Sequence, residues 1–288
     1  MSILSTKAVL AALNVGGWNA RKRDDAASNV VHEHYHATKD SGNFNKTLID
    51  VKDESWVRIT KARTALREYH YAHTLPWAAK GSQLLVAAMY LEFNSDIRKL
   101  IEEYDNAAME FVRSNYERLK LDAKKKRNGL YHEADYPSAA ELARKFYAEV
   151  RFLPVPDAGH VIVDLQNAEV DRIKADTEAM IEQAVAEAQA AVWSRLYEPV
   201  AAMAAALVNP DKRFHDTLVS NVKDIVKMAP AMNLNNDPNL TAMVAEVKRL
   251  TKTGAETLRT DPERYSSDNC RAFVDGSRKI NPRSSSSF

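Results

Sequence analysis

The chain contains 288 residues, with 40 lysines and arginines, 39 aspartates and glutamates, eight glycines and one cysteine. The near-zero net charge argues against a protein that coats duplex DNA through bulk positive charge, and one cysteine excludes an internal disulfide framework and a multi-cysteine zinc site. Abundant alanine, few β-branched runs and few glycines favour a mainly helical fold over a glycine-rich nucleotide-binding fold.

Residues 1–80 are predicted to form an N-terminal helical subdomain, with helices over 3–14, 24–38 and 53–73. The stretch 74–77 ends the last of these helices, because the residue before its proline is forced away from helical backbone angles.

The segment 81–208 is predicted to be a long antiparallel helical hairpin, whose two helices span 82–123 and 167–207. Apolar residues recur every three or four positions along the first helix, as a buried seam requires, and Asn115 is the one polar break. Helices of this length extend beyond a compact domain, so we expect the hairpin to project.

An insert, 128–165, is predicted at the tip of this hairpin. Ser138 and Glu141 have the spacing of a capping box, which opens a short helix. Two short strands, 150–156 and 160–164, are predicted to form a small β-hairpin around a proline-containing turn.

The segment 209–276 is predicted to form C-terminal helices over 210–229, 238–259 and 262–276. Each begins with Asn or Asp followed by proline, the arrangement typical of a helix start. The serine-rich tail, 277–288, has the composition of a disordered terminus.

We expect a soluble, cytoplasmic protein. The apolar stretch before Gly16 lacks the small-residue cleavage pattern of a signal peptide. The longest apolar run, around 200–208, is about half as long as a segment that crosses a bilayer.

His32, Glu33 and His36 match the pattern H-E-x-x-H. On a helix the two histidines lie one turn apart and can both bind zinc, while Glu33 acts as general base for the bound water. Catalytic zinc needs a third protein ligand, and the extended pattern fails because Lys39 and Gly42 replace its glycine and histidine. The alternatives to a zinc-dependent hydrolase are an adventitious metal site and an ordinary polar helix face; no other cofactor is expected.

A second candidate site combines cations with aromatic rings. Its residues are Trp18, Arg21, Lys22, Arg23, Phe44 and Lys46. Such a mixture suits single-stranded nucleic acid, whose bases stack on rings while cations hold the phosphates. The alternative is that aromatic residues of this subdomain, such as Tyr69 and Trp77, belong to its core.

Complete catalytic motifs are missing from the sequence. No histidine follows Cys270, and neither G-x-S-x-G, a P-loop nor a Rossmann fingerprint occurs. We therefore expect a protein without a catalytic site.

Alanine fills several sides of the second long helix, notably at Ala186, Ala190, Ala201 and Ala205. A helix that is apolar on more than one side is normally buried on more than one side. We therefore predict a homo-oligomer that forms through this surface.

Four stretches, 18–22, 39–46, 74–77 and 150–157, together resemble the phage and prophage family called domain of unknown function 3150 (DUF3150). The resemblance spans roughly residues 10 to 235. It implies a phage protein that acts inside a bacterial host, often encoded near a MoxR-type AAA+ ATPase and a von Willebrand A-like protein. It implies no activity.

The first functional hypothesis is therefore a non-enzymatic, phage-encoded interaction or oligomerising protein in the host cytoplasm. It would be accessory to a MoxR-type AAA+ ATPase system or to phage DNA metabolism. The alternatives are a single-stranded nucleic-acid-binding protein and a zinc-dependent hydrolase.

Overall fold

A computed structural model describes residues 3–77, 81–160, 167–208 and 216–251 of the chain. Helices dominate, with one small antiparallel sheet and a two-stranded ribbon, so the mainly helical fold class is confirmed. None of the helices in these ranges has the length and hydropathy to cross a membrane.

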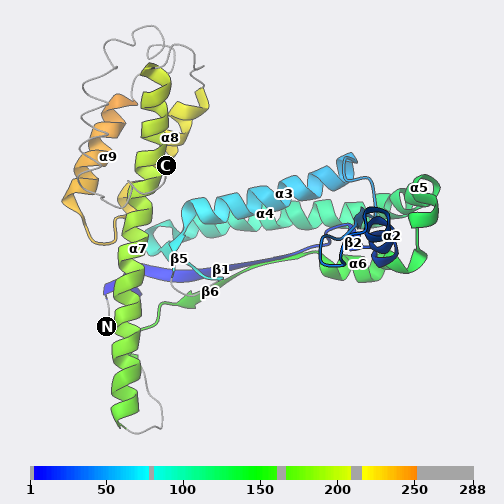
Figure 1. Cartoon of the computed structure of the whole chain (residues 1–288). Helices are drawn as coiled ribbons and strands as arrows, with labels where there is room; N and C mark the ends of the chain where they lie inside the picture. The colour runs from blue at the N-terminus through cyan, green and yellow to red at the C-terminus, as the bar shows by residue number, and fades with distance from the viewer. Residues whose placement is uncertain (1–2, 78–80, 161–166, 209–215, 252–288) are drawn as a thin grey trace. The chain divides into compact units, whose positions relative to one another are not determined.

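The chain divides into two compact units (Figure 1). Unit 1 comprises Met1–Ala12, Tyr71–Leu91 and Phe152–Phe288, and unit 2 comprises Leu13–His70 and Glu92–Arg151. Each unit therefore combines segments that are distant in sequence, whereas the sequence analysis divided the chain into consecutive parts.

The prediction of an N-terminal helix over 3–14 is wrong beyond residue 7. Helix α1 (Ile3–Lys7) is followed by strand β1 (Ala8–Gly16), which pairs with β5 (Gln83–Val86) in an antiparallel register. The alanine and leucine of β1 favour a helix locally, but pairing and burial on the sheet override that preference.

The sheet has the strand order β4-β5-β1-β6. Strand β4 (Leu75–Pro76) lies antiparallel to β5, and Leu84 of β5 is the register partner of both Leu10 and Leu75. These three side chains are buried, so the centre of the sheet belongs to the core.

The first long helix begins later than predicted. Residues 83–86 form β5, a 3₁₀ turn η1 (Ala87–Met89) follows, and helix α4 occupies Tyr90–Glu110. Three consecutive buried apolar residues in β5 suit a strand that is covered on both faces, and they do not follow the spacing of a helix seam.

A π-helical turn, η2 (Phe111–Asn115), joins α4 to α5 (Tyr116–Arg127). The predicted apolar seam holds as far as Phe111, which is fully buried. The π turn inserts an extra residue, so Tyr116 takes the buried position that the seam assigned to Asn115, which is half-buried.

The insert contains the predicted helix, α6 (Ala139–Lys145), and Ser138 and Glu141 form the predicted capping box. Strand β6 (Tyr147–Pro154) is present, but its neighbour in the sheet is β1. Where the second strand of the hairpin was predicted to begin, the structure has a 3₁₀ turn, η5 (Ala158–His160), and residues 161–164 lie outside the described part.

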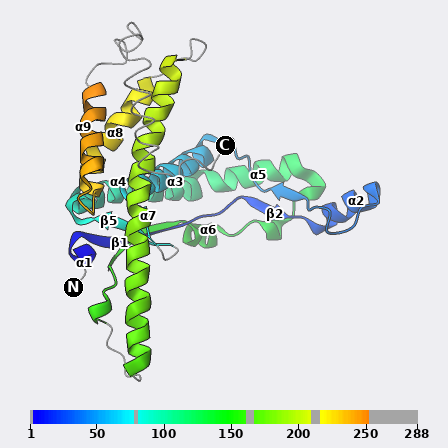
Figure 2. The same cartoon turned by 60° about the vertical axis from the view of Figure 1, so that its left-hand side comes forward.

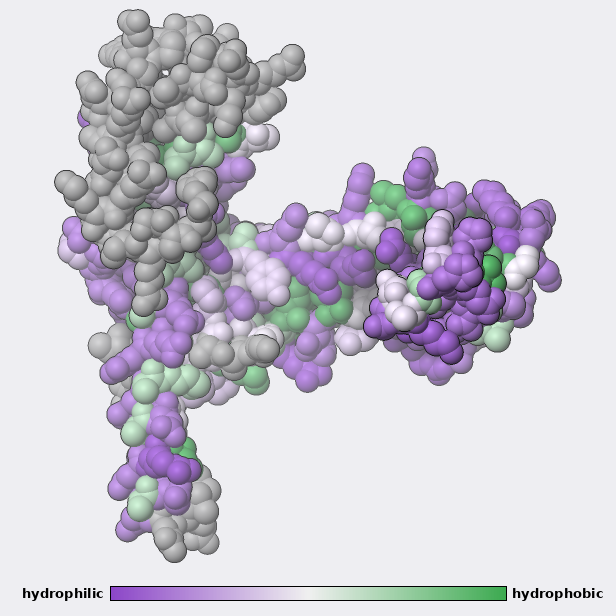
Figure 3. Space-filling model, in the orientation of Figure 1, coloured by the Kyte–Doolittle hydropathy of each residue, from purple (hydrophilic) through white to green (hydrophobic). Residues whose placement is uncertain are grey.

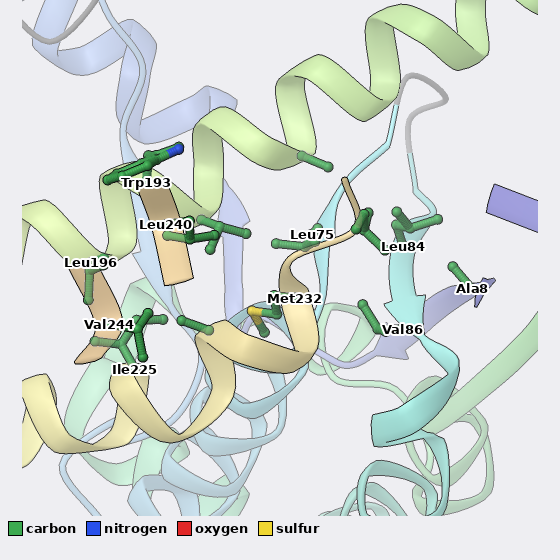
Figure 4. Close-up of a cluster of buried hydrophobic side chains, with 14 of the residues drawn as sticks. Ala8, Leu75, Leu84, Val86, Trp193, Leu196, Ile225, Met232, Leu240 and Val244 are labelled. Atoms are coloured by element: carbon green, nitrogen blue, oxygen red, sulfur yellow. The ribbon is translucent and has the colours of Figure 1, made fainter. Parts of the chain in front are cut away.

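Unit 1 is built around α7 (Asn167–Val208), which packs against α8 (Asp216–Met232) and β4, and contacts α9 (Pro238–Leu250). Figure 4 shows Leu196 of α7, Ile225 of α8 and Val244 of α9 in one cluster. The second long helix and the proline start of α9 after Asp237 are thus confirmed.

The predicted antiparallel hairpin of the two long helices is not confirmed. Helix α7 lies in unit 1, whereas α5 and all of α4 except its first two residues lie in unit 2. The predicted helix 262–276, Cys270 and the tail 277–288 fall outside the described residues.

The first turns of α7 extend beyond α8 and α9 within unit 1 (Figures 1 and 2). Val170, Ile173 and Met180 are half-buried here, and the first buried side chain of α7 in the described range is Ile181. Helix α7 therefore has a well-covered C-terminal part and a less covered N-terminal part.

Unit 2 contains α2 (Asp25–Tyr35), most of α3 (Glu54–His73), and the short strands β2 (Arg21–Arg23) and β3 (Asn45–Thr47), which pair with each other. The predicted helices over 24–38 and 53–73 are confirmed, the first with a shorter end. Aromatic side chains fill the core: Trp18 meets Trp56 at 5.9 Å and Tyr116 at 5.8 Å between ring centroids, both edge to face.

We expect Leu84→Ala to lower the free energy of unfolding of unit 1 by about 2–5 kcal/mol, because it leaves a cavity in the buried cluster that contains Leu10 and Leu75. Urea denaturation followed by circular dichroism measures the loss. Leu91→Ala is the matched control, since Leu91 is 81% exposed and its loss should cost less than about 0.5 kcal/mol. Equal effects of the two changes would contradict the assigned core.

Candidate functional site

A buried lysine joins three segments of unit 2. The Lys46 ammonium lies 2.7 Å from a carboxylate oxygen of Asp24 and 2.8 Å from one of Asp135, and donates a hydrogen bond to the Leu130 carbonyl at 2.9 Å. The three charged side chains are all less than a tenth exposed. Lys46 lies in β3, Asp24 precedes α2, and Asp135 ends the 3₁₀ turn η4 (Glu133–Asp135).

Asp24 also caps α2. Its carboxylate accepts a hydrogen bond from the Ala27 backbone N–H at 3.0 Å, as an N-cap residue does. The Ser28 hydroxyl donates to the Asp24 carbonyl and accepts from the Phe44 backbone N–H. The start of α2 is therefore fixed to the segment before β3.

The pKa values of the three groups follow from these bonds. The Ala27 N–H and then the Lys46 ammonium lower the pKa of Asp24. Burial raises the pKa of Asp135, but hydrogen bonds from Lys22 and Lys46 outweigh it and hold the pKa below its ordinary value. Burial lowers the pKa of Lys46, and the two carboxylates more than compensate and raise it. All three groups are thus charged near neutral pH.

The six residues of the predicted basic–aromatic site do not form one surface. Trp18 is a core residue, 8% exposed, and its ring contacts other rings. Lys46 is interior, and Arg23 pairs with Asp25 at 2.6 Å. Phe44 is exposed. The chain therefore offers no open stacking platform at Trp18.

Three of the six residues nevertheless line one pocket of about 590 Å³, here called the basic pocket. Its apolar lining residues are Ala134, Pro137 and the buried Trp18 and Leu48. Its charged lining residues are the cations Arg21, Lys22, Arg144 and Lys145 and the carboxylates Asp135 and Glu141. Cations outnumber carboxylates two to one, so the pocket is positive.

Both carboxylates of the basic pocket are already engaged. Asp135 pairs with Lys22 at 2.7 Å and with Lys46, and Glu141 accepts hydrogen bonds from the backbone N–H and hydroxyl of Ser138. Within the described part of the chain, no carboxylate pairs with Arg21, Arg144 or Lys145.

Arg144 and Lys145 were not among the residues that the sequence indicated as a binding site. They occupy the last turn of α6, where cations are usual partners of the helix dipole, so their position alone indicates no ligand. Only the fold brings them beside Arg21 and Lys22.

The two predicted zinc ligands do not share one helix face. His32 is buried, and its Nε2 donates a hydrogen bond to the Gly42 carbonyl at 2.8 Å. His36 is the C-cap of α2, with a left-handed φ of 51°, so it leaves the helix before completing the turn. Among the residues described, no three His, Cys, Asp or Glu side chains are grouped as a metal ion would require.

Helix α2 exposes apolar side chains to solvent. Val30 is 65%, Val31 45% and Tyr35 72% exposed; we call these three residues the α2 apolar face. Val31 and Tyr35 lie one turn apart on the same side of α2, and Val30 is turned by about 100° from Val31. The His34 ring lies edge-on to Tyr35 at 4.9 Å, and Ser28 and His32 are buried. Figure 3 shows hydrophobic patches among hydrophilic atoms at the end of unit 2 that carries α2 and α5.

The four alanines predicted at an oligomer interface lie on α7. Ala186 is exposed, while Ala190 and Ala201 are half-buried. The side chain of Ala205 lies outside the described set. Ala184 and Ala188 are fully buried in the unit 1 core, so alanine on α7 serves close packing as well as the surface.

No protein-family model matches the sequence, no curated protein matches it, and no solved structure matches the chain. The resemblance to the DUF3150 family therefore stays a prediction.

We expect Lys46→Met to lower the free energy of unfolding of unit 2 by about 1–3 kcal/mol, because it leaves the Asp24 and Asp135 carboxylates without their shared cation. This loss of stability is smaller than that expected for a deeply buried ion pair, because Asp135 lines the basic pocket and keeps Lys22 as a partner. Urea denaturation measures it.

Lys125→Met is the matched control, because Lys125 is exposed on α5 and has no carboxylate partner among the described residues. A second measurement uses pH. Because the pKa values of Asp24 and Asp135 are lowered in the folded chain, these two carboxylates contribute to the free energy of unfolding above the ordinary carboxyl pKa of about 3.9. Their contribution is lost as the pH falls through the lowered pKa values. Unfolding free energy between about pH 5 and about pH 2 should therefore fall less steeply in Lys46→Met than in the unchanged chain. Identical slopes would contradict the ion-pair assignment.

Proposed function

We propose that this chain is a non-enzymatic interaction protein, and that the α2 apolar face contacts its protein partner. The observation that carries the proposal is the exposure of Val30, Val31 and Tyr35 on one short helix. Isolated exposed apolar residues are ordinary, but an 11-residue helix that exposes Val31 and Tyr35 one turn apart, with Val30 beside Val31, favours a contact surface.

The attachment of α2 favours binding. Asp24, Ser28 and Lys46 fix the helix to β3, so little conformational entropy is lost when a partner docks on its outer side. Burying a Val or a comparable apolar side chain contributes about 1.5–3 kcal/mol, and tyrosine is enriched among the residues that dominate interface affinity. A helical partner with a matching apolar groove suits this geometry.

We further propose a second contact, between copies of the chain, through the α7 surface around Ala186. Ala186 is exposed, and the small side chains of Ala190 and Ala201 follow it along the same side of the helix. A smooth helix surface lets a second helix approach closely, most simply about a two-fold axis.

The DUF3150 resemblance supplies the setting of this proposal. A phage-encoded protein would act in the cytoplasm of its bacterial host, and a MoxR-type AAA+ ATPase is the first partner to test directly. The zinc-hydrolase alternative has no assembled ligand set among the described residues, since His32 and His36 diverge. The nucleic-acid alternative is supported only by the basic pocket, which three of its six predicted residues line.

We expect the double change Val31→Glu and Tyr35→Glu to abolish partner binding without unfolding α2, because both side chains are exposed and glutamate is compatible with a helix. Binding is measured as the set of proteins that the tagged chain recovers from host cells, followed by direct titration with the purified partner.

The control for this experiment is Asn29→Glu, which adds a negative charge to an exposed position of α2 on the side away from Val31 and Tyr35. This control should recover the same partner as the unchanged chain. A partner retained by the Val31 and Tyr35 variant, or lost equally from both variants, would rule out the α2 apolar face as the contact.

Self-association makes a separate prediction. Light scattering at micromolar concentration should give a multiple of the 32.3 kDa chain mass, and Ala186→Glu should reduce it to that of one chain, because a charge is not tolerated in a packed helix interface. Ala186 is preferable to Ala190 as the position to change, since Ala190 is half-buried and glutamate there would also disturb unit 1.

Ala202→Glu is the matched control, because Ala202 is exposed on a different side of α7 and should leave the mass unchanged. A mass of one chain before any substitution, or an Ala186→Glu variant that keeps the larger mass, refutes the α7 interface.

A further inference from the structure

We propose that the basic pocket of unit 2 binds a nucleoside phosphate, either free or at the end of a single nucleic-acid strand. The pocket is defined by Arg21, Lys22, Arg144 and Lys145 around Trp18 and Leu48. This inference goes beyond the interaction function and does not depend on the α2 apolar face.

The charged side chains of the pocket indicate that it binds an anion. The two carboxylates that line the pocket already have partners, Lys22 and Lys46 for Asp135 and the Ser138 cap for Glu141. Arg21, Arg144 and Lys145 have no carboxylate partner among the residues described, and all three are exposed. Three cations without an ion pair thus line one hollow, although Arg144 and Lys145 lie one turn from the Glu141 carboxylate and interact with it electrostatically. The excess of cations over carboxylates favours an anion with several acceptor oxygens.

The two arginines of the pocket indicate that the anion is a phosphate. A guanidinium binds phosphate with two parallel hydrogen bonds, and the pocket has an arginine on each of two elements, Arg21 on β2 and Arg144 on α6. A planar guanidinium also stacks on a base, which an ammonium cannot do.

The size and the apolar part of the pocket indicate that the ligand is larger than a phosphate ion. A volume of about 590 Å³ lies within the range of small-molecule sites, about 300–1,000 Å³. Ala134, which is exposed, and Pro137, which is half-buried, give the pocket apolar surface beside its cations, while Trp18 and Leu48 are 8% and 2% exposed and add little. A ligand that joins a phosphate to a flat, partly apolar group uses both features, and a nucleoside phosphate has both.

The first experiment titrates the full chain with AMP, adenosine and inorganic phosphate by calorimetry at low salt. AMP should bind at least about tenfold more tightly than either fragment, because it alone reaches both parts of the pocket. A single-stranded oligonucleotide is then compared with and without a 5′-phosphate. Tight binding only of the phosphorylated strand identifies a strand end as the ligand, and binding of AMP alone identifies a free nucleotide; both results support the proposal.

The variant Arg144→Glu with Lys145→Glu should weaken AMP binding at least about tenfold. Both residues are exposed in the last turn of α6, so thermal unfolding should change little. Lys125→Glu with Lys126→Glu is the matched control: it makes the same charge change in the last turn of α5, outside the pocket, and should leave affinity within about twofold.

Several results would overturn the proposal. They are an absence of saturable AMP binding, equal affinity for AMP and inorganic phosphate, and an equal loss in both double variants. A phosphoserine peptide that binds more tightly than AMP would overturn the assignment of a nucleoside and leave a phosphopeptide pocket in its place.

Discussion

The buried ion pair of Lys46 with Asp24 and Asp135 is the interaction on which the functional part of unit 2 depends. Removing three charges from water is costly. Their close mutual contacts compensate that cost, together with the Leu130 carbonyl, the Ala27 backbone N–H and the Lys22 ammonium. Because the three residues come from β3, the start of α2 and the turn η4, one cation fixes the relative position of all three segments.

The same cation influences both proposed surfaces. On one side, Asp24 is the N-cap of α2 and so positions the apolar face of that helix. On the other side, Asp135 lines the basic pocket. Without Lys46, the Asp135 carboxylate would lose one of its two cationic partners, and its negative charge would oppose the cations of the pocket. The interior lysine therefore preserves the positive potential of the basic pocket.

Local signals in the sequence predicted those elements whose ends are fixed by their own residues. Ser138 and Glu141 form the predicted capping box, and Asp237 with Pro238 starts α9 as expected. Where burial against residues that are distant in the sequence decides the structure, local sequence patterns do not predict the element. Residues 8–16 have helix-forming side chains, yet they form a strand because β5 lies beside them.

The same limit applies to the candidate sites. Arg21 and Lys22 were singled out for their charge, but their neighbours Arg144 and Lys145 are more than 100 positions away in a helix with ordinary C-terminal cations. Trp18 and Lys46 looked suitable for a ligand because of their type, and the fold places Trp18 among rings and Lys46 between carboxylates. Val30 and Tyr35 carried no sequence signal, since exposure is a property of the folded chain.

The division of both units into distant segments has a consequence for synthesis. Strand β1 leaves the ribosome early, but its partner β5 follows about 70 residues later, and the α7 and α8 side chains that share its core come later still. The apolar residues of β1 therefore stay unpaired until β5 has been made, and their second neighbour in the sheet, β6, follows later still. Long-range closure of this kind slows folding and lengthens the time in which an exposed strand edge can pair with a wrong partner.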